Sequence, residues 1–333
     1  MRMDTDLPKA MSKRTQTVLR KWLTLMGPFL GLFAVILFFA VITGQPEKFL
    51  SPFNIRIILS QTVIVAICAI GMTLVIISGG IDLSVGSAIA LASVATALCV
   101  NGGIDPILAV LVGMLVGGLV GFVNGAVISG LRVVPFIATL GMLGIARGAA
   151  KWIAHQQPVN AVPTWIDGLV VNFPEPSWLI LAPGIWLAIA LAVLMAVVLR
   201  KTVFGRRVFA VGSNEAAARA CGISTNRLKI WIYGVAGLFF GLAGVMEMSR
   251  LRQGDPTVAV GTELDVIAAV VIGGGSLNGG QGTIVGSIVG ALIMSFLRNG
   301  CQQMGWANYI QEIIIGAIII AAVAFDQIRL RRS

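Results

Sequence analysis

The sequence predicts an all-α, polytopic integral membrane protein with about ten transmembrane helices, including re-entrant or broken segments. Of the 333 residues, 57% are hydrophobic and only 11% are charged, whereas a soluble globular domain carries about 25% charged residues. Apolar stretches of about 17–25 residues, long enough to cross a bilayer, follow one another along most of the chain. Basic residues gather in alternate connections between these stretches, as they do in multi-spanning proteins.

Ten apolar stretches account for the predicted helices. They run approximately over residues 27–43, 56–78, 84–100, 105–130, 134–153, 179–199, 230–248, 263–277, 283–297 and 309–326. The eighth is too short for a clean crossing, and glycine-rich sequence follows residues 78 and 272. Irregular backbone lies within a membrane only where protein buries it or water reaches it. We therefore expect broken or re-entrant helices at these two places.

The distribution of basic residues gives the predicted orientation. Residues 1–26 are expected to form an amphipathic cytoplasmic segment on the inner leaflet, residues 27–328 a single transmembrane domain, and residues 329–333 a cytoplasmic tail. The connections at Arg132 and at residues 200–229 are also expected in the cytoplasm, so both termini lie inside. Only seven of the 24 Lys and Arg residues fall elsewhere: Lys48, Arg56, Arg147, Lys151, Arg250, Arg252 and Arg298.

Glycine recurs at every fourth residue in two of the apolar stretches. The two rows are Gly113, Gly117, Gly121 and Gly125, and Gly282, Gly286 and Gly290. Rows of small residues let two helices approach closely inside a membrane. They indicate tight packing within one subunit, and a seam between two subunits is the alternative.

The connection over residues 200–229 is the most informative of the chain. It reads RKTVFGRRVFAVGSNEAAARACGISTNRLK and holds seven basic residues against one acid. A short helix is predicted inside it, because Ser213 or Asn214 can cap its first turn and Gly222 can end it. This helix would lie on the cytoplasmic surface.

The predicted helix carries charge near its ends and little side chain between them. Glu215 lies in its first turn and Arg219 four residues later, where the helix dipole and their mutual attraction favour both. The face between the charges is formed by alanines, namely Ala216, Ala217, Ala218 and Ala220. A helix of about two turns is not stable alone in water. We expect it to dock into a groove of another protein, and an ordinary solvated loop helix is the alternative.

Two glycine-rich motifs lie beside apolar stretches. The first, residues 79–86, contains Asp82, and an acid at an apolar span is a candidate for function because it is expensive there. The alternative is that Asp82 caps the following helix by accepting its free N–H groups, a position that can still shape a gate. The second motif, residues 273–282, is polar and glycine-rich without being a phosphate loop, because GxxxxGK[ST] is absent from the chain.

The two glycine-rich motifs belong to segments that resemble each other weakly. Residues 71–94 and 268–292 each contain an apolar run, a glycine cluster with polar residues, and a Gly/Ser-rich span. Paired interrupted spans in two halves of a transporter indicate the path of the substrate. The residues expected to form the translocation pathway and its gate are Asp82, Ser84, Gly86, Ser276, Asn278 and Gln281.

The residue inventory argues against an enzyme. The chain has no Ser-His-Asp set, no HExxH and no pair of carboxylates on one helical face, and its four cysteines lack metal-ligand spacing. No metal site is therefore expected. The net charge of +10 follows membrane topology instead of gathering on one folded face, so no nucleic-acid partner is expected.

An outward connection over residues 249–265 is dense in charge. It contains Arg250, Arg252 and Asp255. Such a loop is usually a solvated surface, and these three residues are also candidates for docking a soluble partner on the outer side. Charge complementarity at such a surface sets register and association rate.

Four motifs, in order, resemble a known family. They are GMTLVIISGGIDLSVGS, PFIATLGMLGIARG, TVFGRRVFAVGSNEAAARACGIS and ELDVIAAVVIGGGSLNGGQGTIVGSIVGALI. Together they resemble the permease subunits of bacterial ABC importers for ribose and related simple sugars, over roughly residues 22–328. The resemblance implies a second permease copy, identical or a close paralogue, a cytoplasmic ABC ATPase subunit and a periplasmic sugar-binding protein. It also implies the bacterial inner membrane, surrounding lipids, and no cofactor beyond the ATP held by the partner subunit.

The resemblance extends to the residues that couple the permease to its ATPase. Matching positions in this chain are Gly205, Arg206, Gly212, Asn214, Glu215, Ala216, Ala217, Arg219 and Gly222. Gly275 and the polar run 301–303 depart from the usual pattern, which leaves the particular sugar open. The implied function is import of a ribose-like pentose or related monosaccharide. The alternatives are the same architecture carrying branched-chain amino acids or nucleosides, and a secondary transporter without partners.

Overall fold

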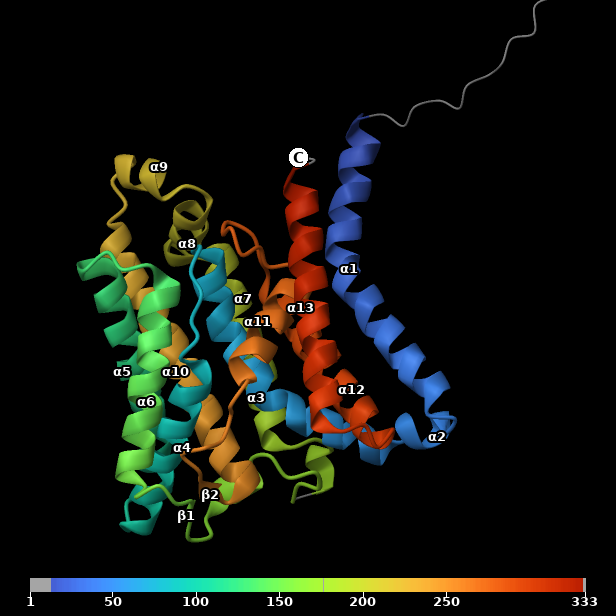
Figure 1. Ribbon diagram of the computed structural model, residues 1–333, viewed down its shortest axis with the longest axis vertical. Coiled ribbons are helices and arrows are strands. Elements are labelled where there is room, and N and C mark those ends of the chain that lie inside the picture. Colours follow the sequence, from blue (N-terminus) through green and yellow to red (C-terminus); the bar gives the residue numbers. More distant parts are fainter. Residues whose placement is uncertain (1–12, 176, 332–333) are drawn as a thin grey trace, which may run out of the picture.

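A computed structural model describes residues 13–175 and 177–331. The predicted amphipathic segment at residues 1–26 and the tail at 329–333 lie largely outside the described residues and side chains. The long helices are α1 (Lys13–Ile42), α3 (Pro52–Ile77), α4 (Val85–Asn101), α5 (Pro106–Gly130), α6 (Pro135–Ile153), α7 (Pro183–Lys201), α10 (Thr225–Leu251), α12 (Ile284–Gln303) and α13 (Asn308–Arg331) (Figure 1).

Short elements connect the long helices. They are α2 (Pro46–Phe49), α8 (Val203–Ser213), α9 (Glu215–Ala220), α11 (Thr262–Ile272), the 3₁₀ turns η1 (Trp165–Gly168) and η2 (Ser177–Leu179), and the strands β1 (Val159–Asn160) and β2 (Gln253–Gly254). The two strands pair antiparallel. The all-α, polytopic prediction is confirmed.

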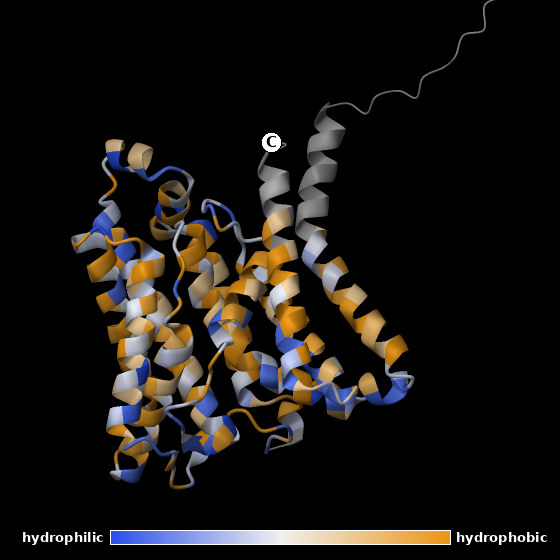
Figure 2. Cartoon of the chain, in the orientation of Figure 1, coloured by the Kyte–Doolittle hydropathy of each residue, from blue (hydrophilic) through white to orange (hydrophobic). Residues whose placement is uncertain are grey.

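Each of the ten predicted stretches contains a helix. Among the described residues, six helices are long and apolar enough to cross a membrane: α3, α5, α6, α7, α10 and α12. Shorter apolar helical lengths are Met26–Ile42 of α1, α4, and Asn308–Ala321 of α13. The apolar lengths of α1 and α13 stand out beside the hydrophilic turn at α2 in Figure 2. The eighth prediction ended too late, because the helix stops at Ile272 and glycine-rich loop follows.

Proline and small polar residues begin several of these helices. Pro52, Pro106 and Pro135 each occupy a first helical position, where the missing N–H costs nothing. Ser51 accepts a hydrogen bond from the Asn54 N–H and caps α3.

Helices α5 and α10 approach each other closely, and glycine makes this possible. A Cβ at Gly117 would overlap the backbone of Gly241, and a Cβ at Gly121 would overlap the Tyr233 carbonyl. The second glycine row works similarly, because a Cβ at Gly290 would overlap the Ala269 carbonyl of α11. Both rows therefore pack within one subunit, as predicted.

The helices α4 and α11 are the half-helices of two broken spans. At about 1.5 Å per residue, the 11 residues of α11 rise about 16 Å, roughly half of a ~30 Å hydrocarbon core. Non-helical backbone over residues 78–84 precedes α4, and non-helical backbone over residues 273–283 follows α11. This confirms the two predicted interruptions.

The described ends of the chain lie together. The start of α1 and the end of α13 are at the same end of the molecule as α8 and α9, whereas α2, β1 and β2 lie at the opposite end (Figure 1). This arrangement agrees with an even number of crossings.

Candidate functional site

The segment between α7 and α10 folds into two short helices. The predicted one is α9, where the Asn214 side chain accepts the Ala217 N–H at 2.9 Å and Gly222 has a φ of +83°. Both capping expectations are thus confirmed. The other helix, α8, was not predicted. Thr202 caps it by accepting the Gly205 N–H at 3.3 Å.

Glu215 ties α9 to the start of α10. Its carboxylate pairs with Arg219 at 3.1 Å, as predicted, and with the Lys229 ammonium at 2.6 Å. Partial burial raises the pKa of Glu215, but the hydrogen bond and charge of Lys229, with the hydrogen bonds of Thr225 and Arg219, outweigh it and hold the pKa below its ordinary value. Because the pKa of Glu215 is lower in the folded state than in the unfolded state, its ion pairs stabilise the fold fully above the unfolded-state pKa. This stabilisation is lost as the pH falls through the folded-state pKa. The contact is therefore intact at neutral pH.

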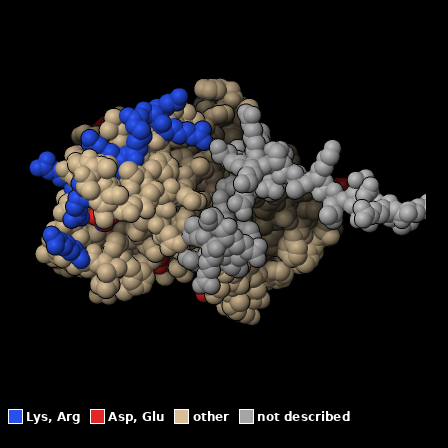
Figure 3. Space-filling view, turned by 90° about the horizontal axis from the view of Figure 1, so that it is seen from above, with Lys and Arg blue, Asp and Glu red and all other residues tan. Residues whose placement is uncertain are grey.

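The outer face of α9 is exposed and small. Ala216, Ala217 and Ala220 are exposed, whereas Ala218 is buried against the protein. Basic side chains surround this face, and Figure 3 shows them gathered on one part of the end surface. Exposed members of this basic surface are Arg200, Lys201, Arg206, Arg207, Arg219 and Arg227. A smooth helix ringed by positive charge fits a preformed groove with acidic edges.

Glycine allows α8 to pack directly on backbone. A Cβ at Gly205 would overlap the backbone of Leu199. A Cβ at Gly212 would overlap the Ile77 carbonyl at the end of α3 and approach the Gly280 N–H at 2.7 Å. The second contact joins the α8–α9 segment to both interrupted spans, because Ile77 precedes one interruption and Gly280 lies in the other.

The two interruptions also touch each other beside α8. The Gly280 N–H donates to the Ile77 carbonyl at 2.8 Å. A Cβ at Gly279 would meet the Gly212 carbonyl at 2.6 Å and the Gly79 backbone at 3.0 Å. We call this backbone contact of Ile77, Gly79, Gly212, Gly279 and Gly280 the glycine junction. Side chains are almost absent from it, so a displacement of α8 acts directly on backbone.

Three predicted pathway residues form the turn above α11. The Ser276 N–H donates to the Gln281 carbonyl at 3.2 Å, and the Ser276 carbonyl accepts the Gly279 N–H at 2.9 Å. Ser276 is buried, whereas Asn278 and Gln281 are exposed at the end of the molecule that carries α8. The latter two side chains thus stand beside the glycine junction.

The half-helices α4 and α11 begin next to each other. A Cβ at Gly86, in the first turn of α4, would overlap the Ala259 carbonyl and lie 2.6 Å from the Glu263 carboxylate of α11. From this meeting point α4 leads toward the β1–β2 end and α11 toward the glycine junction (Figure 1). Facing half-helix starts inside a membrane are typical of a transporter's substrate path.

Asp82 is fully buried in the extended segment before α4. It accepts the Ser84 N–H at 2.8 Å and the Ser84 hydroxyl at 2.6 Å. The Asn124 amide donates to Asp82 at 3.3 Å and to the Ser84 hydroxyl at 2.9 Å. These contacts hold the turn before α4, but among the described residues no side chain caps α4 itself, so the capping alternative is not borne out.

Helix α6 contacts the non-helical segments that precede α4 and α11. The Thr139 hydroxyl accepts the Leu83 N–H at 3.1 Å. Two turns later, Arg147 donates to the Pro256 carbonyl at 2.9 Å and to the Val258 carbonyl at 2.6 Å. Residues eight apart share a helix face, so one face of α6 supports the approach to α4 and the approach to α11.

Two ion pairs line a polar cavity between α3, α10, α11 and α12. Arg250 pairs with Glu247, and Arg298 pairs with Asp265. The cavity measures about 240 Å³. A second cavity of about 450 Å³ shares Gln61 and Arg250 with it and reaches Asn172 in the external loop.

The three residues predicted to dock a soluble partner occupy different environments. Arg250 reaches inward to Glu247 and stands in the wall between the two polar cavities. Arg252 is exposed with a left-handed φ of +55°. Asp255 accepts the Thr257 N–H and hydroxyl, each at 2.7 Å.

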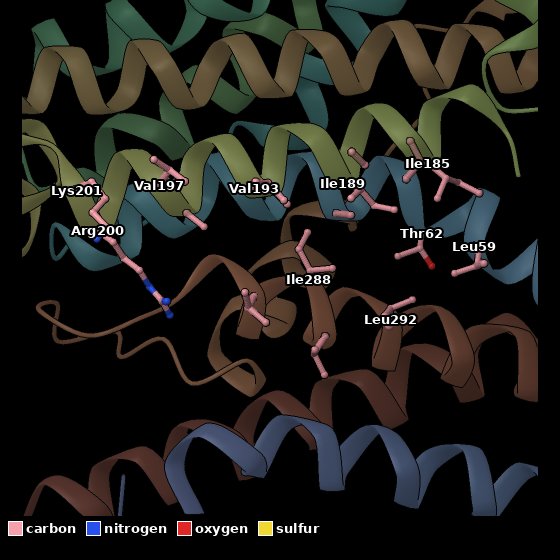
Figure 4. Close-up of a pocket in the computed structure, with 17 residues that line it drawn as sticks. Leu59, Thr62, Ile185, Ile189, Val193, Val197, Arg200, Lys201, Ile288 and Leu292 are labelled. Carbon is pink, nitrogen blue, oxygen red and sulfur yellow. The ribbon is translucent and has the colours of Figure 1, made fainter. Parts of the chain in front are cut away.

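A larger groove between α3, α7 and α12 is apolar. Its volume is about 530 Å³, and aliphatic side chains such as Ile189, Val193 and Ile288 line it, with Arg200 and Lys201 at one end (Figure 4). It lacks the convergent polar groups that orient a hydrophilic solute. The polar cavities, not this groove, are candidates for a hydrophilic solute.

Comparison with known proteins agrees with this arrangement. The sequence profile of a family described as "Branched-chain amino acid transport system / permease component" matches residues 54–323. The chain belongs to this permease family. It is therefore the multi-pass membrane component of a transport system.

Individual relatives of the permease cover nearly its whole length. The chain is 42% identical to the ribose import permease protein RbsC of Bacillus subtilis (strain 168), over 91% of the chain and 92% of the relative. It is 40% identical to RbsC of Escherichia coli (strain K12), over 89% and 92%. It is 36% identical to the L-arabinose ABC transporter permease protein AraH of Azospirillum brasilense, over 88% and 86%. No solved structure matches the permease.

Sequence reasoning missed several contacts that the structure brings to the site. Arg147 had a signal, because a lone arginine within an apolar stretch is expensive and serves a purpose. Asp265 and Arg298 are 33 residues apart, and Glu215 and Lys229 are 14 apart. Such partners are not visible as a local pattern.

Proposed function

We propose that this chain is the permease subunit of an ATP-driven importer that carries a monosaccharide, a ribose-like pentose or related sugar, across the bacterial inner membrane. The observation that carries the proposal is the glycine junction. It links the α8–α9 segment, whose short exposed helix α9 is surrounded by basic side chains, to both interrupted spans. The exposed face of α9 is suited to docking a partner protein, whose movement would displace the helix. The interrupted spans that contact the α8–α9 segment are those expected to open and close.

The sugar class is supported by the relatives. Those named above are ribose and L-arabinose permeases, similar over most of their lengths. The family description supplies a second candidate, because it refers to branched-chain amino acids. We favour sugars because the polar cavities offer hydrogen-bonding groups for hydroxyls.

ATP chemistry belongs to a partner subunit in this proposal. The chain has no phosphate loop, so a cytoplasmic ABC ATPase would bind and hydrolyse ATP. Closure of the ATPase moves α9, α8 carries the movement to the glycine junction, and the junction shifts Ile77 against Gly280. The half-helices α4 and α11 then exchange an outward opening for an inward one. A second permease copy, identical or a close paralogue, completes the membrane part.

A periplasmic sugar-binding protein would deliver its load at the β1–β2 end. Arg252 and Asp255 lie there and stay candidates for docking, and the shared wall at Arg250 leads inward from the same surface. Membrane lipids would cover the apolar outer faces of helices such as α5 and α7. In this orientation both chain ends, with α8 and α9, are cytoplasmic.

The orientation is tested by labelling single cysteines. In a background with Cys221, which is exposed, replaced by serine, we expect Ser213→Cys to react with an impermeant reagent only from the cytoplasm. Asn172→Cys is expected to react only from outside, because it lies at the opposite end and basic residues favour the inside. Labelling of either position from the other side would overturn the proposed topology.

The substrate is tested by uptake in a strain that lacks this chain. Restoring the chain is expected to restore accumulation of one or a few sugars from a panel of pentoses and hexoses, with L-leucine and uridine in the same assay. Accumulation of L-leucine without any sugar would replace the sugar proposal by the branched-chain amino acid candidate. Uptake that persists when the ATPase gene is deleted would contradict an ATP-driven importer.

A further inference from the structure

We infer that the polar cavity between α3, α10, α11 and α12 is a sugar-contact site on the translocation path, with Asp265 as an acceptor for a sugar hydroxyl. The inference rests on the proposed function and deepens it. The residues that line the cavity through polar groups are Gln61, Glu247, Arg250, Thr262, Asp265, Ser295, Arg298 and Gln302.

Charged groups inside a membrane protein are expensive and face a water-filled space when they serve transport. Glu247 and Asp265 are nearly fully buried, whereas about two fifths of the Arg250 and Arg298 side chains are exposed. Two acids face two arginines, so these pairs are neutral overall. Such a cavity gives little net attraction to an ion and offers many hydrogen bonds to an uncharged polar solute.

Asp265 provides the sharpest observation. One carboxylate oxygen, Oδ2, accepts from Arg298. The other, Oδ1, is buried and has no hydrogen-bond partner within the described structure. A buried carboxylate oxygen without a donor costs about 1–3 kcal/mol or more. Asp265 lines the cavity, so a rotation of its carboxyl group would bring this oxygen to a donor there, and a sugar hydroxyl is a donor of the right kind.

The rest of the cavity suits a carbohydrate. Arg298 and the amides of Gln61 and Gln302 can donate to sugar oxygens, while Ile64 and Met294 can cover the C–H face of a ring. A volume of about 240 Å³ is many times the ~15 Å³ that one water requires. Several waters or one small solute therefore fit.

The position of the cavity suits transit. Its wall at Gln61 and Arg250 adjoins the second cavity, which opens toward the external loop. Its inner wall includes Asp265, which lies two residues after Glu263 in the first turn of α11, and Ala259, whose carbonyl lies against Gly86 of α4. A solute entering from the outer end would reach the contact of the two half-helices.

The first test compares ribose with its monodeoxy analogues. Uptake is measured in vesicles that contain the complete importer, with binding protein loaded by each sugar. A site that hydrogen-bonds a hydroxyl discriminates against the analogue that lacks it. We expect Asp265→Asn to lower the preference for ribose over one deoxy analogue by at least about tenfold, a difference of 1.4 kcal/mol. Glu312→Gln, an exposed acid on α13, is the matched control and should leave the preference unchanged.

The second test does not require the Asp265 variant to fold. Ser295 lines the same cavity, so Ser295→Cys should react with a small hydrophilic thiol reagent and thereby lose uptake, with transported sugar slowing the reaction. Ala192→Cys, in the apolar groove, should keep its uptake. Unchanged sugar preference in Asp265→Asn, or full uptake by labelled Ser295→Cys, would overturn the inference. If either of these results is obtained while the parent importer takes up ribose normally, the sugar-contact site is wrong but the proposed function is unaffected.

Discussion

Glu215→Lys is expected to lower ATP-driven sugar uptake by at least about tenfold while the permease stays inserted at normal abundance. The substitution replaces a carboxylate that holds Arg219 and Lys229 by a third positive charge. Exposed pairs of this kind contribute only about 0.2–1 kcal/mol to folding. A tenfold loss corresponds to 1.4 kcal/mol, so it would reflect docking of the ATPase more than loss of the fold.

The measurement is the initial rate of uptake, normalised to permease in the membrane. Glu175→Lys makes the same charge change on an exposed residue of the external loop and should transport normally. Ala217→Trp adds bulk to the exposed face of α9 without touching its ion pairs, and it should fail as Glu215→Lys does. Normal uptake by Glu215→Lys and Ala217→Trp would remove α9 as the docking helix.

Gly212→Ala is expected to have a comparable effect through a different cause. A Cβ at this position would overlap the Ile77 carbonyl and crowd the Gly280 N–H. Both are backbone groups, so neither can move aside alone, and forced overpacking costs about 1–3 kcal/mol. We expect the variant importer to keep its basal ATP hydrolysis while sugar uptake falls at least about tenfold.

A matched glycine separates this effect from helix propensity. Gly141→Ala, in α6, has open space where the Cβ would lie and should transport as the parent does. Hydrolysis and uptake are measured on the same vesicles. If Gly212→Ala couples hydrolysis to uptake normally, the glycine junction is not the route from α8 to the spans.

The helical layout was largely predictable because a bilayer requires long apolar stretches, which are visible directly in the sequence. Apolar length gave ten helices, and clustered glycines gave both interruptions, since a bilayer permits few other arrangements. The caps at Asn214 and Gly222 were predictable because they are local. Helix α8 was missed, because glycine and arginine near its start resemble a loop and its stability comes from burying Val208 and Val211.

The site was predictable in part only. The coupling residues are contiguous in sequence, so their charges and small face can be read directly. What Gly212 packs against depends on Ile77 and Gly280, which come from distant spans. The Asp265–Arg298 pair and the support from Arg147 likewise arise only when helices meet. Long-range pairing of single residues leaves no local pattern.

The most direct test is sugar uptake by purified components in lipid vesicles. The permease is reconstituted with its ABC ATPase, ATP is supplied on the side that carries α9, and loaded sugar-binding protein is supplied on the other. We expect sugar accumulation that requires all three proteins and ATP, and that falls at least about tenfold with Gly212→Ala. Accumulation by the permease alone, driven by an ion gradient, would contradict this expectation.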